Sequence, residues 1–161
     1  MAIKVPEQTK AIKGNTTKRD YVFAVGCRKE AVARVRLYEF VHDGLSWGTT
    51  EIKKGDIIVN QKPIAEYFAG DVNRFRYTEP LRVANAQNKY TISVNVKGGG
   101  PSGQLDAVVA GISNALSKAD IEAYHSLLKK KGFMTRDSRI RERRKVGTGG
   151  KARRAKQSPK R

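Results

Sequence analysis

Residues 90–116 read YTISVNVKGGGPSGQLDAVVAGISNAL, and this stretch decides the fold of the chain. Its apolar residues first occupy every second position, as in a strand with one buried face: Tyr90, Ile92, Val94 and Val96. Glycines 98–100 end this alternation. Apolar residues then recur at helical spacing: Leu105, Val108, Val109, Ile112 and Leu116. The stretch therefore predicts a strand, a tight turn and a core helix, with Ser102 as the helix N-cap.

The same alternation predicts two strands before this stretch. In the first, the residues expected on the buried face are Tyr21, Phe23, Val25 and Cys27. In the second, the residues expected to face the core are Ala33, Val35 and Leu37. Arg34 and Arg36 then lie on the opposite face, where they either meet a partner or form an ordinary solvated surface.

The remaining segments predict shorter elements. We expect a short strand over 57–60, a short helix over 64–68, and a helix over 74–85 that contains Pro80. Residues 42–56 are rich in glycine and predict a loop or an extended hairpin. After the core helix, Asp120 is expected to cap a second helix that ends at Gly132. The expected apolar residues of this helix are Ile121, Tyr124, Leu127 and Leu128.

Charge is distributed unevenly along the 161 residues. The chain has 33 Lys and Arg against 15 Asp and Glu, and most of the net charge of +18 lies C-terminal to residue 128. Such an excess predicts a polyanionic partner. We predict three parts: a flexible N-terminal extension over 1–20, a globular domain over 21–132, and a basic tail over 133–161. The tail has too few large apolar residues to offset its ordering entropy, so we expect it to be disordered on its own.

The turn at residues 98–103 matches the glycine spacing of a dinucleotide-binding loop, which leaves a nucleotide-dependent enzyme as one hypothesis. That motif needs a second parallel strand after the helix, whereas the sequence there predicts another helix. The glycines either serve a tight turn or let backbone N–H groups approach an RNA phosphate. His42, His125 and Cys27 form no catalytic or metal-binding pattern, so we predict no enzyme, no metal and no cofactor. Since no apolar run is long enough to span a membrane, we expect a soluble cytoplasmic protein without a membrane partner.

Several stretches, in order, resemble the family of the ninth protein of the small ribosomal subunit. They are Gly26–Val35, Val59–Pro63 with Tyr67 and Phe68, Gly98–Gln104, Gly132–Arg139, Glu142–Lys145 and Lys160–Arg161. The resemblance implies an α+β fold with a four-stranded sheet backed by helices, like the second domain of ribosomal protein S five, and a long basic C-terminal tail. It also implies a structural constituent of the small subunit head that binds 16S-type rRNA and neighbouring head proteins. The tail would reach the anticodon stem-loop of the tRNA in the peptidyl site during translation.

Carried over by position, the resemblance implies specific contact residues. The side chains expected at rRNA are Arg28, Lys29, Arg34, Arg36, Lys97, Arg136, Arg139, Arg141, Arg143, Arg144, Lys145, Lys151, Arg153, Arg154 and Lys156. The turn residues expected there are Gly98, Gly99, Gly100, Ser102, Gly103 and Gln104. Those expected at tRNA are Lys160 and Arg161.

The chain departs from the family pattern in four places. Cys27 stands where an arginine is usual, and no aromatic residue precedes the terminal Lys160–Arg161. Residues 42–56 and 1–20 extend beyond the usual length and either meet a neighbour or are solvated. A further hypothesis is a free-standing RNA-processing cofactor similar to the protein subunit of ribonuclease P, which is also basic.

Overall fold

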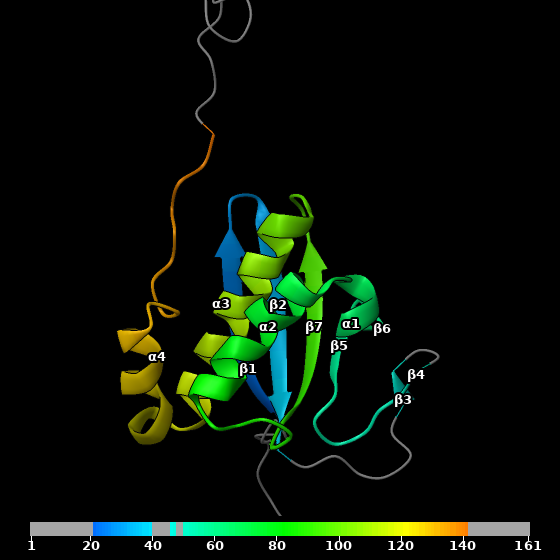
Figure 1. Ribbon diagram of the computed structural model, residues 1–161, viewed down its shortest axis with the longest axis vertical. Helices are drawn as coiled ribbons and strands as arrows, with labels where there is room; N and C mark the ends of the chain where they lie inside the picture. Colours follow the sequence, from blue (N-terminus) through cyan, green and yellow to red (C-terminus); the bar gives the residue numbers. More distant parts are fainter. Residues whose placement is uncertain (1–20, 40–45, 48–49, 142–161) are drawn as a thin grey trace, which may run out of the picture.

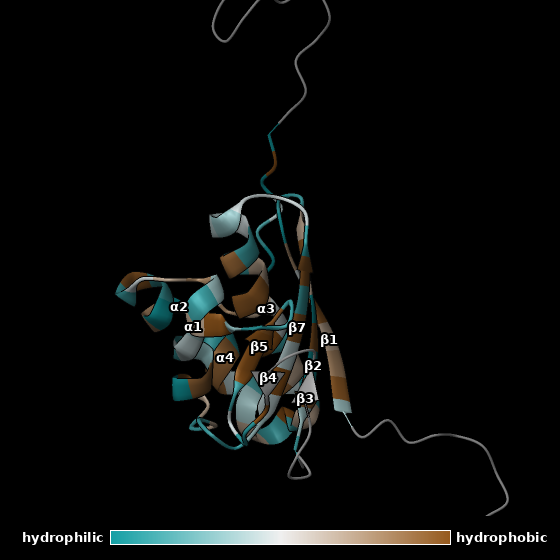
Figure 2. Ribbon diagram, turned by 90° about the vertical axis from the view of Figure 1, so that its right-hand side faces the viewer, coloured by the Kyte–Doolittle hydropathy of each residue, from teal (hydrophilic) through white to brown (hydrophobic). Residues whose placement is uncertain are grey.

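The fold is an α+β arrangement in which the helices of the described residues lie on one side of a mixed sheet (Figures 1 and 2). The computed structural model describes residues 21–39, 46–47 and 50–141. In chain order its elements are β1 (Tyr21–Arg28), β2 (Ala31–Tyr38), β3 (Ser46–Trp47), β4 (Thr50–Glu51), β5 (Ile57–Val59), β6 (Lys62–Pro63), α1 (Ile64–Tyr67), α2 (Asp71–Val83), β7 (Thr91–Lys97), α3 (Pro101–Ala119), η1 (Ile121–His125) and α4 (Ser126–Lys130). The predicted α+β class is confirmed.

The main sheet has five strands within the described residues, in the order β1-β2-β7-β5-β6, so the prediction of four strands was wrong by one. The fifth strand arises from a two-residue turn. Asn60 and Gln61 both have a left-handed backbone, with φ of 47° and 69°, and this turn folds β6 back onto β5. Pro63 has no backbone N–H to donate, and it is tolerated because β6 is an edge strand.

The strand and helix of the deciding stretch are confirmed as β7 and α3. Ile92, Val94 and Val96 are buried against α3, whose Leu105, Ile112 and Leu116 are at most 1% exposed. Ser102 is not the N-cap, contrary to expectation. Gly100 caps α3 without a side-chain bond, because Pro101 takes the first helical position and leaves Ser102 inside the first turn.

Strand β1 buries the face opposite to the one predicted. Ala24 and Gly26 face α3, whereas Phe23 and Val25 are each 39% exposed. The cause is close helix packing: a Cβ at Gly26 would lie 2.0 Å from the carbonyl oxygen of Ala107. Only small residues fit where β1 approaches α3 most closely, so Phe23 and Val25 point to the other side. Strand β2 follows the prediction, with Ala33, Val35 and Leu37 buried and the arginines exposed.

The segment after α3 begins as a π-helical turn, η1, and continues as α4. The side chain of Asp120 accepts a hydrogen bond from the Ala123 backbone, so the predicted cap is confirmed. Tyr124 and Leu128 are buried, but the other two residues of the predicted apolar face, Ile121 and Leu127, are 68% and 41% exposed. The wider π-helical turn changes the angle between successive side chains, which removes these two from the core.

Gly132, with φ of 79°, ends this helical segment in the predicted left-handed conformation. Phe133 and Met134, which follow it, pack against the core.

The smaller elements agree with the sequence. Helix α1 lies within the predicted 64–68, and α2 covers 71–83, three residues ahead of the predicted start, with Pro80 buried inside it. Strands β3 and β4 pair as a hairpin within residues 42–56. None of the described helices combines the length and apolarity that crossing a membrane requires.

Candidate nucleic-acid interface

Three segments that are far apart in the sequence meet at one end of the domain. They are the β1–β2 turn, the β7–α3 turn and the chain near residue 140, and all three lie at the same end of the sheet in Figure 1. Together they enclose an open cavity of about 630 Å³. The residues that line it are Arg28, Lys29, Glu30, Gly99, Gly100, Pro101, Ser102, Gly103, Ile140 and Arg141. Seven of these were predicted to bind rRNA from the sequence.

The glycine turn is required by conformation and by packing. Gly98 and Gly99 have φ of 77° and 65°, which is the left-handed region. A Cβ at Gly98 would also lie 2.4 Å from the carbonyl oxygen of Glu30, in the neighbouring β1–β2 turn. The β1–β2 and β7–α3 turns can therefore touch only because residue 98 is glycine. Their contact places the first turn of α3 at the cavity. The N-terminus of a helix carries partial positive charge, which favours an anion.

Arg28 lies at the centre of an ion-pair chain and is engaged within the protein. Its guanidinium is 3.0 Å from Asp137 Oδ2 and 3.6 Å from Asp106 Oδ2, and its side chain is 18% exposed. It also donates a hydrogen bond to the backbone carbonyl of Arg139, at 3.2 Å. Asp106 in turn pairs with Arg76 of α2. These contacts tie the segment after Gly132 to the folded domain, a role that the sequence did not suggest.

Asp137 holds this chain of ion pairs together because it remains ionised. The side chain and backbone N–H of Arg139 donate hydrogen bonds to its carboxylate, and Arg28 adds a second positive charge. These interactions, led by the Arg139 hydrogen bonds, hold the pKa of Asp137 well below its usual range. Residues 137–141 are therefore held at the cavity by charge-assisted bonds.

A second network, made of hydrogen bonds, connects two of the stretches that resemble the family. Asn60 accepts a hydrogen bond from the Val96 N–H at 2.9 Å and donates one to the Val96 carbonyl at 3.0 Å. Its amide also contacts Tyr67, whose hydroxyl donates to Gln104 Oε1 at 3.0 Å. Gln104 then donates to the Gly98 carbonyl. Gln104, predicted at rRNA, thus stabilises the β7–α3 turn from inside.

The other predicted cations lie elsewhere on the domain. Arg34, Arg36 and Lys97 are exposed on the sheet face that carries no helix. Arg136 is exposed beyond Gly132, and Arg139 pairs with Asp137. The predicted residues that lie outside the described part of the chain are Arg143, Arg144, Lys145, Lys151, Arg153, Arg154, Lys156, Lys160 and Arg161. His42 lies outside it as well.

Sequence reasoning missed Asp106, Asp137 and the exposed apolar residues of β1. The two carboxylates carried no local motif, because their partners are up to 109 positions away in the chain. The face of β1 had a usable signal: Ala24 and Gly26 are the small residues of that strand, and small residues permit a helix to approach closely.

The dinucleotide hypothesis does not fit the fold, since α3 leads into η1 and α4 instead of a second parallel strand. His125 lies 2.9 Å from the Ser117 hydroxyl, between α3 and η1, and Cys27 is half-buried with a free thiol. No group of three or more metal-ligating side chains comes together among the described residues.

The fold and the site define a class of protein: an α+β domain that gathers cationic side chains, a helix N-terminus and the start of a basic C-terminal segment at one end. The family model described as ribosomal protein S9/S16 matches residues 26–161. The chain belongs to this family, whose members are structural, non-enzymatic components of the small ribosomal subunit. Membership also confirms the predicted localisation in the small subunit of the cytoplasmic ribosome.

Two bacterial relatives show how similar the chain is to named members of the family. They come from Renibacterium salmoninarum and an Arthrobacter species, and both are named small ribosomal subunit protein uS9. Each is 39% identical to this chain over 138 residues, which cover 86% of the chain and 74% of the relative.

Proposed function

We propose that this structural component of the small subunit binds 16S-type rRNA through the cavity end of its domain and through its basic C-terminal segment. The observation that carries the proposal is the meeting of three distant segments at one cavity. Lys29 and Arg141 line that cavity from opposite parts of the chain, and both are exposed. The N-terminus of α3 adds backbone N–H groups suited to a phosphate oxygen.

Residues 142–161 supply the larger electrostatic share of this binding. They contain nine Lys and Arg and one acidic residue. The ion pairs of Arg28 and Asp137 hold residues 137–141 at the cavity, so the basic segment leaves the domain from the proposed rRNA surface. Each phosphate contact releases counterions, and this makes RNA affinity fall with salt.

A pair of truncations tests the rRNA proposal. Deletion of residues 142–161 should weaken binding to small-subunit rRNA and flatten its salt dependence. If five of the nine cations contact phosphates, the log–log slope falls by roughly 3 to 4. Deletion of residues 1–20 is the control of equal length, and it should leave the slope nearly unchanged. Equal slopes for the 142–161 deletion and the full chain would contradict the proposal.

We further propose that Lys160 and Arg161 contact the anticodon stem-loop of the tRNA in the peptidyl site, and that other surfaces of the domain contact neighbouring head proteins. Small subunits reconstituted without these two residues should bind peptidyl-site tRNA more weakly while assembling normally. Replacing Lys151 and Arg153 with glutamine removes two charges from the middle of the segment. This variant should weaken rRNA binding more than tRNA binding. Unchanged tRNA affinity after removal of Lys160 and Arg161 would refute the contact.

A further inference from the structure

The sheet face that carries no helix has a regular arrangement of side chains that the rRNA proposal leaves unexplained. The strand register sets them in three rows across β1, β2 and β7: Phe23–Arg36–Ser93, Val25–Arg34–Asn95 and Cys27–Val32–Lys97. We name these nine residues the open sheet face. In Figure 2 it is the side of β1, β2 and β7 that points away from all helices. Neighbouring strands are about 4.8 Å apart, so each row spans roughly 10 Å.

The open sheet face is partly apolar where it meets solvent. Phe23 and Val25 of β1 are each 39% exposed, and Val32 of β2, which lies diagonal to Val25 in the strand register, is 38% exposed. Exposed apolar side chains that adjoin one another mark an interaction surface. A partner that presented only phosphate oxygens would make no favourable contact with these apolar side chains.

The same face is cationic and contains no carboxylate. Arg34, Arg36 and Lys97 are exposed, and within the described residues no acidic side chain forms an ion pair with any of them. The guanidinium of Arg36 lies 5.2 Å from the ring centre of Tyr21. Charge complementarity therefore selects a polyanion that also exposes flat apolar surfaces.

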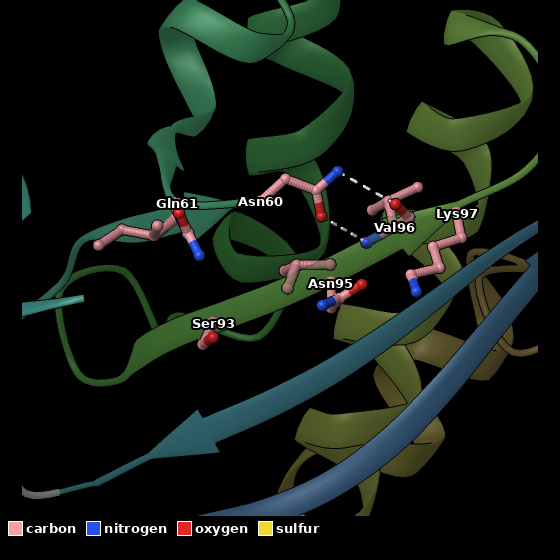
Figure 3. Close-up of a pocket in the computed structure, with 8 residues that line it drawn as sticks. Asn60, Gln61, Ser93, Asn95, Val96 and Lys97 are labelled. Carbon is pink, nitrogen blue, oxygen red and sulfur yellow. Dashed lines mark hydrogen bonds between the residues drawn. The ribbon is translucent and has the colours of Figure 1, made fainter. Parts of the chain in front are cut away.

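Polar groups able to recognise base edges lie on the β7 side. A shallow groove of about 320 Å³ runs along β7 and is lined by Ser93, Asn95 and Lys97, with the β5–β6 turn on its other side (Figure 3). The amide of Asn60 is occupied by the Val96 backbone, as the dashed lines show. Asn95 is exposed beside it and offers both a donor and an acceptor.

We propose that the open sheet face binds an unpaired segment of RNA. A base stacks on Phe23, the phosphates contact Arg34 and Arg36, and a base edge meets Asn95 and Ser93. Unpaired nucleotides carry all three features together, whereas the bases of a duplex are already stacked and paired. This inference rests on the proposed rRNA binding and names the kind of RNA that one surface takes.

The test compares Phe23→Leu with Phe75→Leu in the full-length protein. Phe75 is an exposed phenylalanine on α2, away from the open sheet face, which makes it a matched control. The probes are a twelve-nucleotide single strand of mixed sequence and the duplex of the same sequence, measured by fluorescence anisotropy at several salt concentrations. Circular dichroism melting confirms that each variant is folded.

Phe23→Leu should lower affinity for the single strand roughly 5- to 150-fold, with an unchanged salt slope and unchanged duplex affinity. Phe75→Leu should bind as the original chain does. Arg34→Gln with Arg36→Gln should reduce the single-strand slope by about 1.4.

Unchanged single-strand affinity in Phe23→Leu overturns the inference, as does an equal loss in Phe75→Leu. If Phe23→Leu instead impairs only subunit assembly with a protein neighbour, the surface binds protein and the inference is wrong. The proposed rRNA binding fails separately, when the original chain binds neither small-subunit rRNA nor either probe.

Discussion

Replacing Gly26 with alanine should force β1 away from α3. The added Cβ would lie 2.0 Å from the Ala107 carbonyl oxygen and 2.3 Å from the Gly111 nitrogen, whereas real Cβ atoms essentially never come within 3.0 Å of such atoms. Both obstacles are backbone, so no side-chain rotation can relieve the clash. The strand and helix must separate by roughly 1 Å, and such a gap removes a quarter to a half of the dispersion energy of each contact across it.

The expected loss is about 3 kcal/mol in the free energy of unfolding, at the upper end of the range for overpacked cores. For a domain of this size that corresponds to a fall in Tm of roughly 10 °C or more. The assay is urea and thermal unfolding of the full-length chain, followed by circular dichroism.

Two other glycines provide graded controls. Gly111→Ala should cost less, because its Cβ would come within 3.0 Å of one side-chain atom only, Val35 Cγ2 at 2.6 Å, and would stay 3.3 Å from the nearest backbone atom, while alanine favours the helix by about 1 kcal/mol. Gly100→Ala has no atom within 4 Å and should cost under about 1 kcal/mol. A Gly26→Ala protein as stable as Gly100→Ala would refute the close-packing argument.

Three further predictions follow from buried or bonded side chains. Leu128→Ala should lower the free energy of unfolding by about 2–5 kcal/mol because Leu128 is fully buried, and Leu127→Ala by much less because Leu127 is 41% exposed; equal losses in urea titrations would contradict the packing of α4. Asn60→Ala removes both bonds to Val96 and should cost about 1–3 kcal/mol, so a cost near zero would mean that these bonds do not stabilise the turn. The pKa of Asp137 is lowered by Arg139, so its contribution to stability is present above the ordinary carboxyl pKa of about 4 and is lost as pH falls through the lowered value. An NMR titration should find this carboxylate still ionised at pH 3, and titration near pH 4 would disprove the Arg139 contact.

The alternating and helical patterns predicted β2, β7 and α3 because each of these elements has one apolar face and one partner layer. The same rule failed for β1. Both of its faces contain apolar residues, and only the close approach of α3 decides that Ala24 and Gly26 are the buried pair. The cap at Asp120 and the stop at Gly132 were predictable because they depend on local backbone conformation.

The features of the candidate site likewise fall into those that local patterns predict and those that only packing decides. Glycine spacing and the local excess of Lys and Arg can be read along the chain, so the sequence by itself predicted a turn that a phosphate could approach and a C-terminal segment suited to a polyanion. Only the tertiary structure decided that Arg28 forms ion pairs with Asp106 and Asp137, and that Phe23 and Arg36 lie on the same sheet face, which no described helix covers. Ion pairs and strand pairs join residues that are distant in the chain. The strand register is set by packing, and no local sequence pattern contains that information.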